Sequence, residues 1–434
     1  MMRFAASAPL RRDAGARCGY IHSVVTTSHL AQAAVDSSAS PITLSGADEL
    51  KLAQRMISYD TSHADGIKSC VGYLAGWLEA RDIDYSSFSV HGLPVVVAQV
   101  GSGPVTIVLH THIDVVPGSE GQFIPYVDRD YLWGRGAYDM KGATATMFCV
   151  LADIAPIIDE LGIAVRLVMV PDEETDEQRE EYGTEQLVER GYLGDFVICG
   201  EPTDFHVGIQ AKGVLDVRID VDGRSAHGAT PWLGVNAIIK AMDVFDRLTT
   251  LPFAQESSTF YDRPSINLGR IKGGDRLNQV PERCTMEVDI RFLPEQPIDR
   301  LRRELQSLPG CRVSEITSRP PAMVSTSNPF LKLLASAADA CTDVDVQLVG
   351  RDGTNDGVHF LKRGIPSVEF GPLGSGHHGP EEKVSIKSMR EYRVALLQFL
   401  HSVSEQVADL TGVTVPTQRD GNDRSRSRDV RGDD

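Results

Sequence analysis

Between residues 46 and 213, short apolar runs alternate with stretches of helical periodicity. Nearly continuous apolar runs are typical of strands that are covered on both faces. Four runs predict such strands: VVVAQV (95–100), VTIVLHTHID (105–114), VRLVMV (165–170) and DFVICGEP (195–202). A helix is expected over 142–155, directly after a glycine-rich turn. This alternation of buried strands and helices indicates an α/β layer.

The middle of the chain follows a different pattern, in which apolar and polar residues alternate strictly. Such alternation predicts strands with one solvent-facing side, and it occurs in GVLDVRIDVDG (213–223), SINLGRIKGG (265–274) and CTMEVDIRFL (284–293). Helices are expected over 235–248 and 297–307. We therefore expect a separate α+β domain over 214–322. It is inserted into the α/β domain, because a helix (330–342) and apolar strands follow it.

Both ends of the chain depart from these patterns. Residues 1–45 begin with a segment rich in Ala, Ser and Arg, and we expect a disordered or targeting-like extension. Residues 406–434 end in TQRDGNDRSRSRDVRGDD, whose alternating charges predict a disordered tail. The α/β domain is then formed by two parts, 46–213 and 323–405.

Charge and cysteine content narrow the function classes. The 43 basic and 60 acidic residues give a formal net charge of −17, which argues against nucleic acid as a partner because phosphate binding needs a basic face. We expect no membrane-spanning helix, since no apolar run reaches the ~18 residues that one needs. The seven cysteines are scattered and form no CxxC pair, as in reduced cytosolic proteins, so a cytoplasmic location is expected.

Histidines and carboxylates stand at the ends of the predicted strands. In open α/β sheets, sites form beyond the carboxyl ends of strands. A single such residue is most often a cap or a solvated side chain, but five segments with this feature point to a common site. The residues concerned are His112, Asp114, Asp139, Glu173, Glu174, Glu201 and His378.

The spacing of His112 and Asp114 indicates how the two side chains could act together. They are two positions apart on an extended chain and so face the same way. A metal-bound histidine usually donates its other N–H to a carboxylate, a role that fits Asp114, although a turn-capping aspartate is the alternative. His110 has the same parity, and a strand histidine packed nearby is favoured over a ligand.

The candidate ligands suit a pair of divalent ions. Two neutral imidazoles with the carboxylates of Asp139, Glu174 and Glu201 carry a charge of −3, which two zinc ions and a bridging hydroxide neutralise. Mixed nitrogen and oxygen ligands favour zinc, with cobalt or manganese as substitutes, whereas calcium prefers more oxygens. Glu173 points away from its neighbour Glu174, so we expect it to be the general base of a hydrolysis.

Seven motifs together resemble the acetylornithine deacetylase and succinyl-diaminopimelate desuccinylase family of dizinc peptidases and deacylases. They occur in order over about 46–405: LHTHIDVVP, GRGAYDMKG, PDEET, ICGEPT, GRSAHGATPWLGVNAI, GRIKGGDRLNQVPERC and HHGPEE. The resemblance implies a zinc-peptidase-like catalytic domain with an inserted lid domain through which two copies form a homodimer. It also implies these roles: His112 and Glu201 on one zinc, Glu174 and His378 on the other, Asp139 bridging, Glu173 as base and Asp114 orienting His112.

The resemblance also includes less specific matches at individual residues. In HHGPEE, the family spacing to the closing acid Glu382 selects His378 over His377. The resemblance further implies that His227 steadies an oxyanion, although a histidine in a turn of small residues is more often a surface residue. It implies substrate contacts for four residues: Asn278, Arg291, Gly353 and Thr354.

These features predict a metal-dependent hydrolase that cleaves the amide bond of an N-acyl amino acid. A dipeptidase or carboxypeptidase of the same family is the alternative. A non-catalytic binding protein is disfavoured because no ligand or base is lost, and a structural metal site because such sites favour cysteine and leave no spare base. The acidic insert after PDEET departs from the family pattern, and we expect its residues 176–181 to form a solvated rim.

Overall fold

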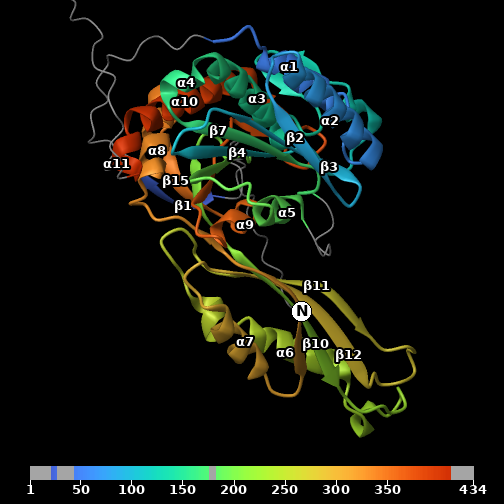
Figure 1. Ribbon diagram of the computed structural model, residues 1–434. Coiled ribbons are helices and arrows are strands. Elements are labelled where there is room, and N and C mark those ends of the chain that lie inside the picture. The colour runs from blue at the N-terminus through green and yellow to red at the C-terminus, as the bar shows by residue number, and fades with distance from the viewer. Residues whose placement is uncertain (1–20, 27–43, 175–181, 412–434) are drawn as a thin grey trace, which may run out of the picture.

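The computed structural model describes residues 21–26, 44–174 and 182–411, which form a larger domain and an elongated smaller one that projects from it (Figure 1). The larger domain is built on a ten-stranded sheet with the order β1-β15-β9-β16-β8-β4-β7-β3-β2, and β14 pairs with β9. The smaller domain has its own four-stranded sheet, with the order β11-β12-β10-β13.

Parallel strands occupy the centre of the larger sheet. β4 (Thr106–His112) pairs in parallel with β7 (Ala164–Val170) and β8 (Phe196–Cys199), and β16 (Ser367–Glu369) pairs in parallel with β8. The carboxyl ends of these four strands therefore meet at one edge. The other strands of the sheet are β1 (Ile21–Thr26), β2 (Tyr85–Val90), β3 (Leu93–Val100), β9 (Val207–Ala211), β14 (Ala322–Met323) and β15 (Gln347–Arg351).

Helices cover both faces of this sheet (Figure 1). Successive strand residues point to opposite sides, so the apolar strands present apolar side chains to the helices on each face. Ile107 and Leu109 belong to a core formed with seven helices on one face, and Val108 and Val168 pack with α5 and α9 on the other. The helices are α1 (Glu49–Ile57), α2 (Ala64–Glu79), α3 (Gly142–Ile154), α4 (Ile158–Leu161), α5 (Gly183–Glu189), α8 (Pro329–Cys341), α9 (Gly357–Leu361), α10 (Ile386–Glu405) and α11 (Val407–Thr411).

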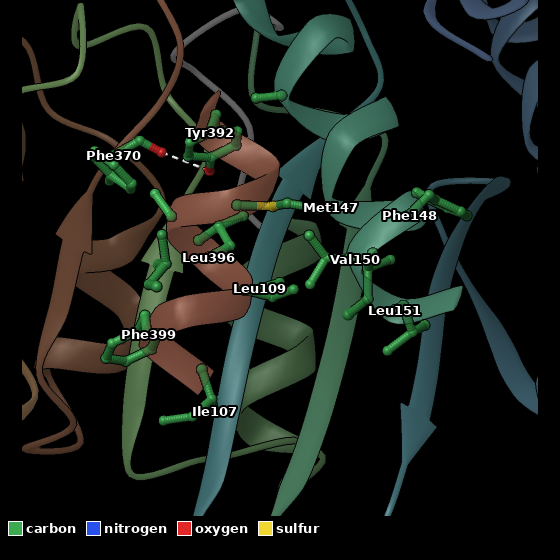
Figure 2. Close-up of a cluster of buried hydrophobic side chains, with 14 of the residues drawn as sticks. Ile107, Leu109, Met147, Phe148, Val150, Leu151, Phe370, Tyr392, Leu396 and Phe399 are labelled. Atoms are coloured by element: carbon green, nitrogen blue, oxygen red, sulfur yellow. Dashed lines mark hydrogen bonds between the residues drawn. The ribbon is translucent and has the colours of Figure 1, made fainter. Parts of the chain in front are cut away.

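The core between α3, α10 and the sheet joins segments that are far apart in sequence. Figure 2 shows Met147 of α3 and Leu396 of α10 beside Leu109 of β4, while the Tyr392 hydroxyl donates to the Phe370 carbonyl oxygen at 2.7 Å. By length and composition, the helical stretch Ala137–Leu161 could cross a membrane, but 78% of its apolar window is buried inside the fold. It serves here as the central core helix.

The inserted domain alternates as its sequence predicts. In β10 (Gly213–Asp222), Val217, Ile219 and Val221 are buried and the residues between them are more exposed. The helices α6 (Ala237–Leu248) and α7 (Ile298–Gln306) complete its core with the sheet. The other strands are β11 (Ser265–Gly273), β12 (Arg283–Phe292) and β13 (Arg312–Arg319).

A third sheet of four short strands lies beside the parallel strand ends. Its order is β17-β18-β6-β5, and it pairs β18 with β6, so the loop after β17 lies next to the turn after β6. The strands are β5 (Tyr126–Asp128), β6 (Tyr131–Trp133), β17 (Gly374–Ser375) and β18 (Lys383–Ser385).

The predicted α/β class with an inserted α+β domain is confirmed, but the expectations for the two ends need correction. β1 pairs antiparallel with β15, so residues 21–26 belong to the sheet rather than to a disordered extension, because their run IHSVVT favours strand formation at an exposed edge. Helix α11 extends the ordered chain into the predicted tail, where Val407 is buried. The rest of both predicted extensions and the acidic insert 176–181 lie outside the described residues.

A buried ion network ties three helices of the larger domain together. Arg393 of α10, which is 3% exposed, donates from Nε and Nη2 to the carboxylate of Asp153 in α3, both at 2.7 Å. Its Nη1 donates to Glu49 of α1 at 2.6 Å. Removing this guanidinium would leave two buried carboxylates without their cation.

We expect Arg393→Met to lower the free energy of unfolding by about 3–5 kcal/mol, the usual cost of breaking a buried ion pair from one side. Arg390→Met is the matched control on the same helix, because Arg390 is 70% exposed and lies 3.7 Å from Glu49; its effect should stay within about 0.5 kcal/mol. Urea unfolding followed by circular dichroism measures both. Equal losses in the two variants would contradict the role of the network.

Candidate metal centre at the strand ends

The parallel strands bring the candidate ligands of three segments to one place. His112 is the last residue of β4, and its register partner is Val170, the last residue of β7. Glu173 and Glu174 follow three and four residues later, and Glu201 follows the end of β8 by two residues. These positions follow from strand register alone, which is why the sequence pattern could indicate them.

Asp139 is held in place by a single buried carboxylate. Glu382 accepts hydrogen bonds from the N–H groups of Gly136, Tyr138 and Asp139 at 2.9, 3.0 and 3.0 Å, and it pairs with Arg135 at 2.7 Å. These contacts join the turn after β6 to the loop after β17. Glu382 therefore fixes the backbone from which the Asp139 side chain enters the site.

The candidate ligands converge on Asp139. His112 Nε2 lies 3.1 Å from Asp139 Oδ1 and 3.9 Å from Glu201 Oε1. His378 Nε2 lies 2.8 Å from Glu174 Oε1 and 3.3 Å from Asp139 Oδ2. All five predicted metal ligands are thus linked through Asp139 and His112 into one cluster.

Asp114 positions the chain on both sides of the site. Its carboxylate accepts from the N–H groups of Glu173 and Glu174 at 3.2 and 2.7 Å. Its Oδ1 lies 3.5 Å from His112 Nδ1, which also lies 3.1 Å from the Asp114 carbonyl oxygen. Asp114 therefore contacts both the ring of His112 and the backbone of the two adjacent glutamates.

Like charges gathered at the strand ends shift the pKa values of the site. Burial raises the pKa of Glu201 well above its usual range, and the charge of Asp139 adds to the effect. Burial and Glu201 likewise raise the pKa of Glu173. For His112, burial acts downward, but hydrogen bonds with Asp114 and Asp139 hold its pKa well above the usual value. Positive charge placed among these groups would relieve their repulsion.

The predicted substrate residues divide into two sets. Arg291, Gly353 and Thr354 line a cavity of about 340 Å³ together with the ligand cluster, which we call the metal cavity. His227 and Asn278 lie elsewhere in the inserted domain, where His227 bridges to Gln279 and accepts from the Ala229 N–H at 3.1 Å. The structure therefore does not bring these two residues to the ligand cluster of the same chain.

His110 is buried and makes contacts other than with the ligand cluster. Its Nε2 lies 2.8 Å from the Thr184 hydroxyl, which donates to Asp356 at 2.5 Å. Burial lowers the pKa of His110 to about 3, so the ring is neutral. It is a packed strand histidine, as the sequence pattern favoured.

Sequence reasoning missed several residues of the metal cavity. His377 contacts Asp139 more closely than His378 does, although the family spacing had set it aside. Glu369 ends β16 and carries the same strand-end signal as the other acids; Arg351 pairs with it at 2.8 Å. No sequence signal marks Arg319, which reaches the cavity from the end of β13.

The donor set fits divalent metal ions. Two groups of three side chains each bring ligand atoms within 4.8 Å of one another, namely Asp139–His377–His378 and His112–Asp139–Glu174. Asp139 belongs to both groups. Within the described part of the chain, Glu201 Oε1 is buried without a hydrogen-bond partner, so it presents a lone pair beside His112. Imidazole and carboxylate together are the ligands of catalytic zinc sites.

A mixed sheet with parallel central strands, this cluster at their carboxyl ends and an inserted α+β domain are the features expected of a metal-dependent hydrolase. The chain belongs to peptidase family M20/M25/M40, whose model matches residues 108–402. It is similar to a probable succinyl-diaminopimelate desuccinylase of Staphylococcus epidermidis, with 26% identity over 373 residues, 77% of this chain and 91% of the relative. It is 30% identical over 315 residues to a succinyl-diaminopimelate desuccinylase of Sphingopyxis alaskensis, 67% of this chain and 79% of the relative.

Solved structures agree with this fold. Aminopeptidase PepT of Bacillus cereus matches with a TM-score of 0.69 and 15% identity, over 83% of this chain and 99% of that chain. A dinuclear metal-binding peptidase of the M20 family from Bacillus subtilis matches with a TM-score of 0.61 and 17% identity, over 82% of this chain and 98% of that chain. At these identities the likeness describes the fold alone.

The position of Glu382 yields a test that needs no substrate. Glu382→Gln replaces a carboxylate oxygen that faces N–H groups with a donor, so the Asp139 segment should loosen and metal affinity fall about 10- to 100-fold. Glu381→Gln is the neighbouring control, since Glu381 is exposed. Metal content after equilibration against buffered zinc, measured by elemental analysis, compares the two. Wild-type affinity in Glu382→Gln would show that the segment does not depend on this carboxylate.

Proposed function

We propose that the protein hydrolyses the amide bond of an N-acyl amino acid, with Glu173 as the general base. Family membership and the desuccinylase relatives support this reaction class. The observation that carries the proposal is the position of Glu173, which lines the metal cavity but, unlike Glu174 and Glu201, has no contact with His112 or His378 within 4.0 Å among the described residues. A carboxyl group with a raised pKa beside the ligands is suited to accept and return a proton.

The residues of this chain divide the work of hydrolysis. Glu173 would take a proton from the attacking water and give it to the amine nitrogen as the carbon–nitrogen bond breaks, which releases a carboxylate and an amine. Asp114 holds the backbone N–H of Glu173, so the base keeps its place during both transfers. Divalent ions bound at the site would polarise the amide carbonyl and lower the pKa of a water molecule.

For the ions, we propose two zinc ions, with cobalt or manganese as substitutes. The 2.8 Å approach of His378 to Glu174 supports this pair as ligands of one ion, and the 3.9 Å approach of His112 to Glu201 supports the other pair. Asp139 would be shared, since it belongs to both ligand groups. The place of His377 beside Asp139 makes it a competing ligand.

For the substrate carboxylate, Arg291 is the candidate partner. It lines the metal cavity, and its Nε and Nη2 donate to Asp289 at 2.8 and 3.1 Å, which fixes the plane of the guanidinium. A guanidinium in a fixed plane can bind a carboxylate with good geometry. Gly353 and Thr354 line the same cavity and are proposed to contact the substrate there.

We further propose that the protein is a homodimer joined through its inserted domain, so that His227 and Asn278 serve the site of the partner. His227 follows the ten-residue β10, which extends about 30 Å from the larger domain at ~3.3 Å per residue. Several large apolar side chains are exposed in the same region, as expected for an interface: Trp232, Leu233, Ile239 and Leu277.

A dipeptidase or carboxypeptidase of the same family is the alternative. The similarity of the fold to that of an aminopeptidase supports this alternative. The cytoplasmic location also remains a prediction. Release of amine from N-acetyl, N-succinyl and N-formyl amino acids and from dipeptides would separate these substrate classes.

Glu173→Gln tests the base. The variant should keep its metal content, because no ligand is removed, but lose about 10²- to 10⁴-fold in turnover on the best substrate of that panel. Chelation should abolish wild-type activity, and zinc or cobalt should restore it. Glu189→Gln, an exposed glutamate on α5, is the control. Near-normal turnover of Glu173→Gln would remove it from the mechanism.

Mixed dimers test whether His227 acts across the interface. Glu173→Ala and His227→Ala chains, co-expressed in equal amounts, form mixed dimers in about half of all cases if assembly is random. If His227 acts in trans, one site of each mixed dimer has both residues, which gives roughly a quarter of wild-type activity from two nearly inactive parents. Confirmed mixed dimers without recovered activity would end the trans assignment.

A further inference from the structure

The chain crosses between the two domains twice, and Lys212 lies in the first crossing, between β9 and β10. Its side chain is buried, and its N–H donates to the Arg351 carbonyl oxygen at 3.2 Å. The next residue, Gly213, has no room for a side chain, because a Cβ atom there would lie 2.2 Å from Cζ of Phe292. Lysine is rarely buried unless it is paired, so a lysine in this closely packed crossing needs partners.

The ammonium group of Lys212 contacts both domains. Its Nζ lies 2.7 Å from Asp352 Oδ1 of the larger domain, and it donates to the Ser265 hydroxyl at the start of β11 at 3.1 Å. It also lies 5.2 Å from the centre of the Tyr261 ring, whose hydroxyl donates to the Arg351 carbonyl oxygen at 3.0 Å. The inserted domain therefore holds the charge that pairs with Asp352.

Asp352 is the first residue beyond β15, in the loop that brings Thr354 to the metal cavity. The far side of this loop is anchored separately, because Asp356 accepts from the Thr184 hydroxyl at 2.5 Å. Thr354 lies midway between Asp352 and Asp356 in sequence. Loss of the ion pair with Lys212 would therefore free the near side of the loop and let the Thr354 side chain shift.

The hydroxyl of Thr354 is sensitive to such a shift. Its Oγ1 is buried and has no hydrogen-bond partner within the part of the chain that the structure describes. A buried hydroxyl is costly to leave unpaired, so a bound substrate is its expected partner. Displacement of a substrate-contacting group by about 1 Å can reduce the rate about 10²-fold. Residues that fix this loop therefore affect turnover without touching the substrate.

We propose that Lys212 is a positioning residue for the proposed reaction, which holds Asp352 and thereby places the Thr354 hydroxyl in the metal cavity. The inference rests on the proposed function and adds a residue that does not itself line that cavity. An ion pair that only stabilises the fold is the alternative. The two roles differ in whether the effect of changing Lys212 depends on the Thr354 hydroxyl.

A double-mutant cycle separates the two roles. Lys212→Met should lower kcat/KM on the best substrate of the panel about 10-fold, roughly the contribution of one hydrogen bond. Thr354→Val removes the hydroxyl and keeps the shape of the side chain, so it should lower kcat/KM by a similar factor. In the Thr354→Val background, Lys212→Met should cost less than about twofold more, because the group that it positions is already gone.

Two further variants make the result specific. Lys387→Met removes an exposed lysine that lies 3.1 Å from Asp343, so it breaks a lysine–aspartate pair away from the cavity, and its kcat/KM should equal that of the wild type. Ser265→Ala removes the hydroxyl that accepts from Lys212 at an exposed position. It should lower kcat/KM by a smaller factor, again only when the Thr354 hydroxyl is present. This variant decides the cycle if Lys212→Met fails to fold.

Hydrogen exchange tests the inference without a substrate. Peptides from residues 351–361 should exchange faster in Lys212→Met than in the wild type, because one anchor of the loop is lost. Peptides from β4 and Lys387→Met serve as controls and should exchange as in the wild type. If the wild type cleaves nothing in the panel, the proposed function fails, while the exchange measurement still decides whether Lys212 holds the loop.

Four outcomes would overturn the inference. These are wild-type kcat/KM in Lys212→Met, wild-type kcat/KM in Thr354→Val, equal losses from Lys212→Met with and without the Thr354 hydroxyl, and unchanged exchange of the loop in Lys212→Met. Equal losses together with a lowered melting temperature would assign the ion pair to stability alone.

Discussion

Asp139 accepts contacts from three histidines at once, and it belongs to both groups of candidate metal ligands. It can do so because Glu382, a residue 243 positions later, binds its N–H and those of its neighbours. Two buried carboxylates so near one another are tolerated because N–H groups and Arg135 surround Glu382, and imidazoles surround Asp139. The arrangement of the whole centre therefore depends on two carboxylates. Glu382 fixes the backbone of Asp139, and the side chain of Asp139 faces the histidines.

The loop after β15 is anchored on several sides, and it lines the metal cavity. Arg351 pairs with Glu369 at 2.8 Å, Asp352 with Lys212 at 2.7 Å, and Asp356 accepts from Thr184 at 2.5 Å. These contacts come from β16, from the residue just before β10 and from α5. Because each partner is partly or fully buried, the loop offers Thr354 and Asn355 from a fixed backbone rather than a mobile one.

The two ends of the inserted domain lie far apart, and under the proposed function each contributes different residues to catalysis. Its near end brings Arg291 and Arg319 to the metal cavity of the same chain. Its far end carries His227, beyond a strand that spans about 30 Å. One twisted sheet can thus contribute to the site of its own chain and, under the proposed homodimer, to the site of the partner.

The sequence by itself determined the strands and the groups at their ends, since both depend on local patterns. Continuous apolar runs mark buried strands, parallel strands share one carboxyl edge, and His112, Glu174 and Glu201 follow from that geometry. Only the tertiary structure decided which residues complete the site. The contact of His377 with Asp139, the guanidinium of Arg319 beside Tyr182, and the pairing of β1 with β15 join segments more than 100 residues apart. No periodicity records such contacts, because they are set by how the domains and loops pack rather than by the strand that carries each residue.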